Sequence, residues 1–394
     1  MYFDVIVIGA GPAGSTAARH LALRGLYTLL LDARSFPRHK ICGGGITART
    51  ARALNDLDLS PVIEDQTFRV VLTHGDRRIH ITTGRPLVYQ VQRRRFDQLL
   101  LEAAGLAGCI IRTGEAVIDL QEDDRRVEVI TADRRYRAAF VVGADGGQGM
   151  TARHIGSPLR RWCGAVEWEY PLTEEEHVSR WAGALDFDFS AVRDGYGWIF
   201  PKQAHLSVGL GVLRARRQRL PNLLKAYMHR NTLDPEREVL TRHGASLAIS
   251  PQGRIGRAHS RRILLAGDAA GLTDPFSGEG IYYAVRSGQI AAGVLAGQAA
   301  GRPQLHLYQA ELNSVIGEDL RWSWRLARAF YPAVDWFHRR LISPQRTGFA
   351  ELLVELAQGN ITYREAATRA IPLLLRAGRG KGSPPLSIEK SAIV

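Results

Sequence analysis

The chain has 394 residues, which suits one large enzyme of two joined lobes or two to three domains. Its 45% hydrophobic and 23% charged residues are ordinary for a folded protein, and no run of 18 apolar residues predicts a spanning helix. The net charge of +13 favours an anionic substrate or an anionic membrane surface. Nucleic acid is not expected as a partner, because there is no RNA-binding signature, zinc-finger spacing or long basic tail.

The three cysteines, Cys42, Cys109 and Cys163, have neither metal-ligand spacing nor the even number of a disulfide framework. We therefore expect no metal site and a cytoplasmic location, with peripheral contact at the inner membrane surface as a further option. Residues 5–8 are apolar but do not predict a signal peptide, because no basic segment precedes them and glycine follows.

The first thirty residues predict a β-α-β unit. Residues 3–8 form a continuous apolar strand, the turn GAGPAG follows, and residues 15–24 predict a helix that Gly25 closes. Residues 28–31 form a second strand, which ends at Asp32.

The turn between strand and helix has the spacing G-x-G-x-x-G. Gly9 permits the tight turn, Gly11 lets the backbone approach a pyrophosphate, and Gly14 allows close packing of helix on strand. Free N–H groups at the helix N-terminus favour an anion there. Asp32 is placed to accept a hydrogen bond from a ribose hydroxyl and repels a 2′-phosphate. The unit predicts a bound dinucleotide, and by itself it allows both NAD and FAD.

Further along, the chain alternates between two kinds of pattern. The expected elements are a loop (35–50), an extended segment passing into a helix (89–101), a hairpin (116–130), a buried strand (140–144), an antiparallel sheet (160–250) and a second strand-turn-helix pattern (261–300). The nucleotide-binding lobe is therefore expected to be discontinuous, over residues 1–60, 88–160 and 255–302. The remaining segments predict a substrate lobe (61–87 and 161–254), C-terminal helices (303–381) and a loose tail (382–394).

Residues 263–271 put Asp268 at the end of a strand, and residues 275–280 then lead into a helix over 281–295. This stretch resembles the second FAD motif of flavoprotein reductases and hydroxylases. The resemblance implies that Asp268 binds the ribityl chain and that the backbone of residues 278–281 lies against the pyrimidine edge of the flavin. It favours FAD over NAD.

Residues 142–146 resemble a third motif, found in p-hydroxybenzoate-hydroxylase-like flavoproteins. The resemblance implies that Asp145 helps to bind FAD and a nicotinamide donor. The chain has Gly149 where the family has serine, which puts donor binding in doubt more than FAD binding. Arg93 matches a family arginine near the flavin pyrophosphate, with a solvated helix charge as the alternative.

Three further segments resemble the geranylgeranyl reductases. They are Pro37-Arg-His-Lys-Ile-Cys-Gly-Gly-Gly45, Tyr196-Gly-Trp-Ile-Phe-Pro201 and a C-terminal segment over 353–363. The resemblance implies an α/β fold with a Rossmann-like FAD-binding lobe, a second antiparallel-sheet lobe for the substrate and a C-terminal helical region. It also implies reduction of isoprenoid carbon–carbon double bonds, on a prenyl lipid, diphosphate, quinone or chlorophyll side chain.

This chemistry delivers a hydride from flavin N5 to one alkene carbon and needs a proton donor for the other. Cys42, in the glycine-rich loop, is the candidate donor, with a small buried hydrophobe as the alternative. Tyr196, Trp198 and Phe200 alternate on one strand and are expected to wall an apolar tunnel, unless they are ordinary core aromatics. Lys40 is expected to hold an anionic head group or a cofactor phosphate, or to be solvated.

The expected catalytic residues are thus Cys42, Tyr196 and Trp198. The residues expected to bind FAD are Gly9, Gly11, Pro12, Ala13, Gly14, Asp32, Ala33, Lys40, Cys42, Gly43, Gly44, Arg93, Ala116, Asp145, Gly146, Gly267, Asp268, Pro275, Gly278, Gly280 and Ile281. No second G-x-G-x-x-G has the same context, so NADPH is expected to dock transiently or an electron-donor protein such as a ferredoxin to reduce the flavin.

Two alternatives remain open. A monooxygenase or halogenase would share the fold, but halogenases carry Trp-x-Trp-x-Ile-Pro, and residues 196–201 differ from it at two positions. A noncatalytic basic protein that binds membranes or nucleic acid is the other alternative, and a flavin spectrum in the purified protein would count against it.

Overall fold

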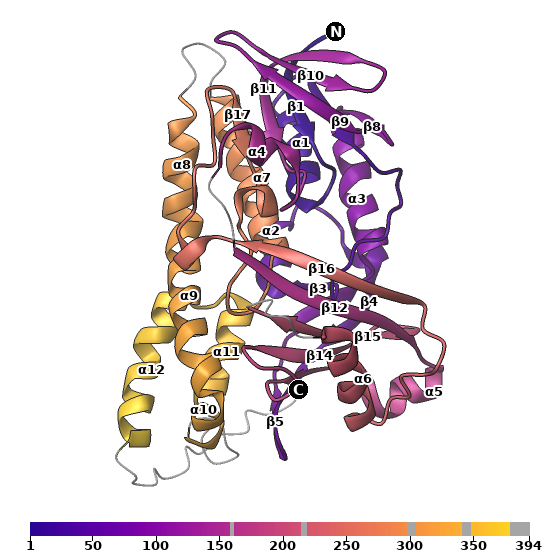
Figure 1. The fold of residues 1–394 in the computed structure, drawn as a ribbon, viewed down its shortest axis with the longest axis vertical. Coiled ribbons are helices and arrows are strands. Elements are labelled where there is room, and N and C mark those ends of the chain that lie inside the picture. The colour runs from indigo at the N-terminus through magenta and orange to yellow at the C-terminus, as the bar shows by residue number, and fades with distance from the viewer. Residues whose placement is uncertain (158–160, 214–218, 298–303, 341–347, 379–394) are drawn as a thin grey trace.

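The computed structural model describes residues 1–157, 161–213, 219–297, 304–340 and 348–378. The predicted tail over 382–394 lies outside these residues, as do the last residues of the third nucleotide-binding segment. Figure 1 shows an elongated molecule with one sheet at its upper end, a second sheet across its lower half, and C-terminal helices along one side.

The first sheet has the parallel core that the N-terminal sequence predicts. Its central strand β1 (Tyr2–Ile8) pairs in parallel with β2 (Thr28–Asp32) on one side and β11 (Arg135–Gly143) on the other. The remaining strands are β8 (Ile110–Thr113) beside β2, β17 (Ile263–Leu265) beside β11, and the antiparallel hairpin β9 (Val117–Glu122) and β10 (Val127–Thr131). The apolar run in β1 and β2 is buried throughout its inner positions, as a central parallel strand requires.

Two long helices pack beside the glycine turn, α1 (Pro12–Ala22) and α7 (Ile281–Ala296). A third, α3 (Arg93–Leu106), packs against α1. The prediction that the first helix begins at residue 15 is wrong: it begins at Pro12, because the fixed φ of proline suits the first helical position, where no N–H is needed.

The second sheet has the order β16-β12-β15-β14-β13-β5-β6. Its strands are β5 (Arg69–His74), β6 (Arg77–Thr82), β12 (Arg161–Pro171), β13 (Ala184–Asp188), β14 (Gly195–Pro201), β15 (His205–Val212) and β16 (Thr241–Ile249). All neighbours are antiparallel except β13 and β5, which are parallel. The antiparallel prediction therefore holds within residues 160–250, whereas the pairing with β5 brings in a strand from much earlier in the chain. Helix α6 (Leu220–Arg230) lies against β12 and β15, after the short α5 (Glu174–Glu176).

A small third sheet joins the two lobes, with the order β3-β7-β4. Its strands are β3 (Gly45–Thr47), β4 (Ile63–Thr67) and β7 (Val88–Val91). The prediction that residues 35–50 are all loop is wrong at their C-terminal end, where β3 leads into helix α2 (Ala48–Ala53). The side chain of Thr47 accepts a hydrogen bond from the Thr50 N–H and caps this helix.

The C-terminal helices are α8 (His306–Leu312), α9 (Glu318–Phe330), α10 (Val334–Arg340), α11 (Gly348–Gln358) and α12 (Tyr363–Gly378). A further short helix, α4 (Met150–His154), follows β11. Phe330, Tyr331 and Phe337 are buried in a core shared with β5, β6 and β13, whereas Trp336 is 40% exposed. Three of these four aromatic side chains therefore pack against the apolar face of the second sheet. Among the described helices, none is long and apolar enough to cross a membrane.

Candidate functional site

One cavity of about 920 Å³ extends from the glycine turn of the first lobe to helix α11, between the two lobes. The predicted site residues that line it are Gly9, Gly11, Pro12, Ala13, Asp32, Ala33, Lys40, Cys42, Gly43, Gly44, Arg93, Asp145, Gly146, Tyr196, Trp198, Gly267, Asp268, Pro275, Gly278, Gly280 and Ile281. The remaining two, Gly14 and Ala116, lie outside the lining. Ala116 is exposed between Glu115 and Val117, which do line the cavity.

The glycines of the first turn differ in what surrounds them. A methyl group on Gly14 would overlap the Gly9 carbonyl oxygen, so this position serves the packing of α1 on its turn. A methyl group on Gly11 would meet only the Arg38 guanidinium, at 3.6 Å, so its backbone faces the cavity. Helix α1 has no side-chain cap, which leaves its first N–H groups available to an anion. Asp32 is buried, and its carboxylate accepts hydrogen bonds from the N–H groups of Ala10 at 2.7 Å and Arg34 at 2.8 Å.

Asp145 explains why glycine replaces serine at position 149. Its carboxylate occupies the space that a side chain on Gly149 would need. It accepts hydrogen bonds from the Thr151 N–H at 2.9 Å and from the Thr151 hydroxyl. Burial raises the pKa of the Asp145 carboxyl. Thr151 thus supplies the hydroxyl partner of Asp145.

The loop between β17 and α7 is organised by Asp274, which sequence reasoning missed. Its buried carboxylate accepts hydrogen bonds from the N–H groups of Phe276 at 2.7 Å and Ser277 at 2.8 Å, and from the Ser323 hydroxyl at 2.7 Å. Asp268, at the start of the same loop, accepts from the Thr273 hydroxyl at 3.1 Å. Hydrogen bonds within the loop and one from helix α9 therefore fix its conformation.

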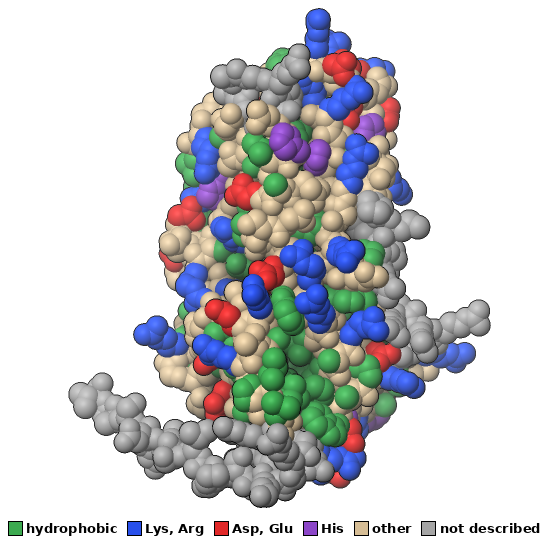
Figure 2. All heavy atoms as spheres, turned by 90° about the vertical axis from the view of Figure 1, so that its left-hand side faces the viewer, with side chains coloured by type: hydrophobic (Ala, Val, Ile, Leu, Met, Phe, Trp, Pro, Cys, Tyr) green, Lys and Arg blue, Asp and Glu red, His purple; other side chains and the backbone are tan. Residues whose placement is uncertain are grey.

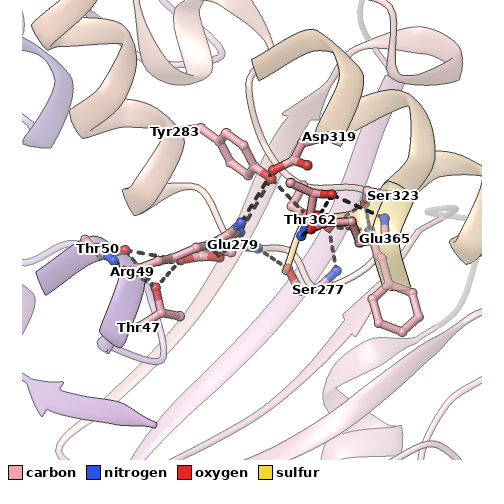
Figure 3. Close-up of polar contacts among 12 residues, drawn as sticks. Thr47, Arg49, Thr50, Ser277, Glu279, Tyr283, Asp319, Ser323, Thr362 and Glu365 are labelled. Carbon is pink, nitrogen blue, oxygen red and sulfur yellow. Dashed lines mark hydrogen bonds and ion pairs between the residues drawn. The ribbon is translucent and has the colours of Figure 1, made fainter. Parts of the chain in front are cut away.

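A buried ion pair fixes the other side of this loop (Figure 3). Glu279 accepts from the Arg49 Nε at 3.0 Å and from the Thr47 hydroxyl at 2.6 Å. Burial by itself would lower the pKa of the Arg49 guanidinium, but the nearby carboxylate of Glu279 raises it well above its ordinary value. The figure shows Tyr283 and Asp319 beside the same pair. The network connects the start of α2 with the loop before α7.

Two arginines meet one buried carboxylate near the glycine turn. Arg93 donates to Asp97 at 2.8 and 2.9 Å, and Arg38 lies 3.2 Å from the same carboxylate. Burial opposes the charge on Arg93, yet Asp97 and the neighbouring Cys42 thiol raise its pKa. Two guanidinium groups share one carboxylate, which leaves local positive charge beside the N-terminus of α1. Arg93 lines the cavity, and it lies beside Cys42, which sequence reasoning did not foresee.

Each glycine after Cys42 is packed against a neighbouring element. A methyl group on Gly43 would meet Phe200 at 2.7 Å, and one on Gly45 would meet Val88 at 2.9 Å. On Gly44 it would overlap the Val91 carbonyl oxygen and come within 2.7 Å of Lys202 Nζ. The loop therefore lies directly between β14 and β7. Only glycine lets the Cys42 backbone come so close to the aromatic strand.

A chain of buried polar groups holds this loop in place. Glu167, on β12, accepts a hydrogen bond from the Cys42 N–H at 2.8 Å and another from the Ser207 hydroxyl. The Ser207 oxygen in turn accepts from the indole N–H of Trp198 at 3.0 Å. The Lys202 ammonium donates to the Gly43 carbonyl oxygen at 2.7 Å. Burial raises the pKa of the Glu167 carboxyl and lowers that of the Lys202 ammonium.

The cavity continues past the Cys42 loop into an apolar region. Its wall includes Tyr196, Trp198 and Phe200, whose rings follow one another along β14 with centroids 6.2 Å apart. The Tyr196 hydroxyl donates to the Ser277 carbonyl oxygen, which ties the second lobe to the loop before α7. Further apolar lining residues are Val70, Leu72, Ile81, Leu185, Phe187, Phe189, Leu353, Val354 and Leu356. The aromatic residues of β14 thus line the cavity, as predicted.

These residues fit a bound FAD. The open backbone at Gly11, the uncapped helix end and the nearby arginines suit a pyrophosphate, and the buried carboxylate at Asp32 suits a ribose. Among the residues that the structure describes, no group of three histidine, cysteine or acidic side chains could hold a metal ion.

Sequence reasoning missed Asp274, Glu279, Arg49, Glu167 and Lys202. Asp274 and Glu279 lie within the motif that carried Asp268, and their place there could have singled them out. Glu167 stands between Val166 and Trp168, and a carboxylate flanked by apolar residues is a signal for a buried functional charge. Arg49 and Lys202 carried no local signal.

Comparisons with known proteins agree with this geometry. A family model described as an FAD binding domain matches residues 2–318. An uncharacterized protein of Methanosarcina barkeri is 32% identical over 93% of each chain. The geranylgeranyl diphosphate reductase of Rhodobacter capsulatus is 30% identical, over 77% of this chain and 78% of its own. The digeranylgeranylglycerophospholipid reductase of Methanococcus aeolicus is 29% identical, over 75% of this chain and 77% of its own.

Solved structures show the same fold. A geranylgeranyl bacteriochlorophyll reductase-like protein from Thermoplasma acidophilum has a TM-score of 0.80 at 22% identity, covering 94% of this chain and 99% of that chain. A flavin-dependent brominase has a TM-score of 0.74 at 19% identity, covering 97% of this chain and 100% of that chain. At these identities the likeness extends to the fold alone, and the sequence relatives decide the family. The chain belongs to the geranylgeranyl reductase family of FAD-dependent oxidoreductases.

Proposed function

We propose that this protein reduces isoprenoid carbon–carbon double bonds, with Cys42 as the proton donor. The observation that carries the proposal is that the Cys42 loop, the aromatic residues of β14 and the apolar region share one cavity with the FAD-type glycine turn. An unactivated alkene is a poor hydride acceptor, so a donor held close to it matters. The reductase names of the sequence relatives agree with this chemistry.

Reduced FAD, when bound, supplies the hydride. The residues of this chain then have three tasks. The apolar wall with Tyr196, Trp198 and Phe200 excludes water and orients the alkene. The Cys42 thiol gives its proton to the second alkene carbon, and the Arg93 guanidinium beside it stabilises the thiolate that remains. Solvent returns the proton to Cys42 before the next cycle.

The substrate that suits the cavity is a prenyl chain with an anionic head group. Lys40, two residues before Cys42 in the cysteine loop, lines the cavity, and a cationic side chain favours a phosphate or diphosphate. One reductase relative is named for a diphosphate substrate, and the other is named for a glycerophospholipid substrate. For the electron donor, we propose transient NADPH or a donor protein such as a ferredoxin.

The test is anaerobic incubation of dithionite-reduced enzyme with geranylgeranyl diphosphate and with a digeranylgeranyl glycerophospholipid. The expected product has two more hydrogens for each bond reduced, seen by mass spectrometry. Absence of any mass gain with both substrates would reject the reductase proposal. A Cys42→Ser variant that keeps full activity would reject only the proton-donor role.

A halogenase or monooxygenase is the alternative on the same fold. It predicts oxygen consumption by the reduced enzyme that rises on addition of an aromatic substrate. The reductase proposal predicts that oxygen uptake does not respond to such a substrate. The noncatalytic alternative is set aside, because the chain belongs to an enzyme family.

We also propose that the protein contacts anionic membranes from one side. Figure 2 shows hydrophobic side chains gathered over the lower part of the face that carries the C-terminal helices, with Lys and Arg around them. Trp336 of α10 and Ile371 and Leu375 of α12 are exposed apolar residues of these helices. Tryptophan, leucine and arginine together favour a membrane interface. Flotation with vesicles containing anionic lipid, but not with neutral vesicles, is the expected result.

A further inference from the structure

We infer that Glu167 is a positioning residue of the proposed reduction. Its carboxylate accepts a hydrogen bond from the main-chain N–H of Cys42 and reaches the Trp198 indole through the Ser207 hydroxyl, so it holds the cysteine loop and the indole in register. The inference rests on the proposed role of Cys42. Glu167 comes from β12, 125 residues beyond Cys42 in the chain, so no local feature of the cysteine loop contains it.

The first step of the argument is the cost of placing this carboxylate where it is. Glu167 is 4% exposed and lies on the cavity wall, on the second strand from one edge of the second sheet. A buried carboxylate is unfavourable unless its oxygens are hydrogen-bonded. Both oxygens have partners: Oε2 accepts from the Cys42 main chain, and Oε1 accepts from Ser207. The carboxylate is therefore fixed by the two groups that it connects.

The second step is the connection to the aromatic wall. Ser207 uses its hydrogen on Glu167, so its oxygen is oriented to accept the indole N–H of Trp198. The indole is also fixed by shape, because it lies over Gly209, where any side chain would overlap it. One carboxylate thus sets the Cys42 backbone and the Trp198 ring relative to each other.

The third step is the opposite charge on the same loop. Lys202 is 2% exposed, and its ammonium donates to the carbonyl oxygen of Gly43. The Glu167 carboxylate thereby holds the loop at the Cys42 N–H, and the Lys202 ammonium holds it at the carbonyl of the following residue, Gly43. Such charge-assisted hydrogen bonds are stronger than neutral ones and give one geometry instead of several.

The main variant is Glu167→Gln, which keeps the shape of the side chain and removes its charge. Cys42 and Ser207 donate to different oxygens of the carboxylate, and in glutamine one of these two positions becomes an NH2 donor. We expect kcat to fall by roughly 10- to 100-fold, as misplacement of a reacting group does, while KM for geranylgeranyl diphosphate and FAD affinity change less than about twofold. The matched control is Glu169→Gln, on the same strand, which carries no hydrogen bond to Cys42 and is expected to keep its kcat.

A double-mutant cycle separates positioning from a merely structural role. If Glu167 acts through Cys42, then Glu167→Gln lowers kcat in the native background but adds nothing in the Cys42→Ser background. Equal losses in both backgrounds, or a kcat within twofold of the native value, would overturn the inference. Circular dichroism and FAD stoichiometry check that each variant folds. Should Glu167→Gln not fold, Ser207→Ala interrupts the same chain of bonds at its middle and is expected to lower kcat with KM unchanged.

A second readout needs no catalysis. Cys109 and Cys163 are buried, and burial raises the pKa of each thiol to about 12, so iodoacetamide should alkylate Cys42 first in the folded protein. Loosening of the loop in Glu167→Gln is expected to raise the alkylation rate of Cys42 at least about threefold, and Glu169→Gln is not. If no substrate is reduced at all, the proposed function fails, and an unchanged alkylation rate would still overturn the positioning role.

Discussion

Two glycines of the same turn have different roles, one in packing and one in cofactor binding, and alanine variants should distinguish these roles. Gly14→Ala places a methyl group on the Gly9 carbonyl and is expected to destabilise the apoprotein by about 3 kcal/mol, as overpacking does. Gly11→Ala meets only the flexible Arg38 side chain, so it should fold normally but bind FAD more weakly, because its methyl group enters the cavity. Urea unfolding of the apoproteins and fluorescence titration with FAD measure the two effects. Equal unfolding free energies for both variants would contradict this assignment.

At the same scale, the sequence could single out Cys42 but not what holds it. The glycines after it, at positions 43 to 45, indicate a close backbone approach. They do not name Phe200, Lys202 and Val88 as the groups approached. Glu167 contacts Cys42 only because β12 lies beneath the loop in the folded chain. Contacts over such separations depend on how the two lobes pack, which no local pattern contains.

At the scale of elements, the buried ion pair of Arg49 and Glu279 allows a test of what holds two distant segments together. It joins α2 to the loop before α7 across 230 residues of chain. Glu279→Gln leaves the buried Arg49 guanidinium with only the more distant Asp319 carboxylate, 3.8 Å away, and should cost about 3 kcal/mol of unfolding free energy. The effect is measurable by urea denaturation at pH 7.

The control for this pair is the exposed ion pair between Arg261 and Asp124. Asp124→Asn should leave the unfolding free energy unchanged within error, because water screens exposed charges. A loss for Glu279→Gln no larger than that for Asp124→Asn would show that the buried pair is not what joins α2 to the loop before α7. The helix α2 itself was predicted as loop, since a six-residue helix carries too little periodicity to be seen.

For the molecule as a whole, the shared cavity predicts that FAD stabilises both lobes together. All seven tryptophans lie between positions 162 and 336, outside the residues that form the first sheet. Their fluorescence therefore reports on the second lobe and the C-terminal helices, while the glycine turn lies in the first. Free FAD at 100 times its Kd should stabilise the protein by about 2.7 kcal/mol.

We expect the thermal midpoints from tryptophan fluorescence and from circular dichroism to rise together on addition of FAD. The Gly11→Ala variant, which should bind FAD weakly, is the control and should show a smaller rise by both probes. A rise in the circular dichroism midpoint alone would mean that the lobes unfold independently, and that the cavity does not couple them.

The sequence by itself determined the β-α-β start, the FAD motif around Asp268, the cysteine loop and the family, because each lies within a short stretch whose chemistry is local. Only the tertiary structure decided that Arg93 lies beside Cys42, that β5 pairs with β13, and that Glu167 and Lys202 bind two consecutive residues of the cysteine loop. The physical reason is that hydrogen bonds and ion pairs act over a few ångströms. Residues more than a hundred positions apart come within that range only after the sheets have formed and packed.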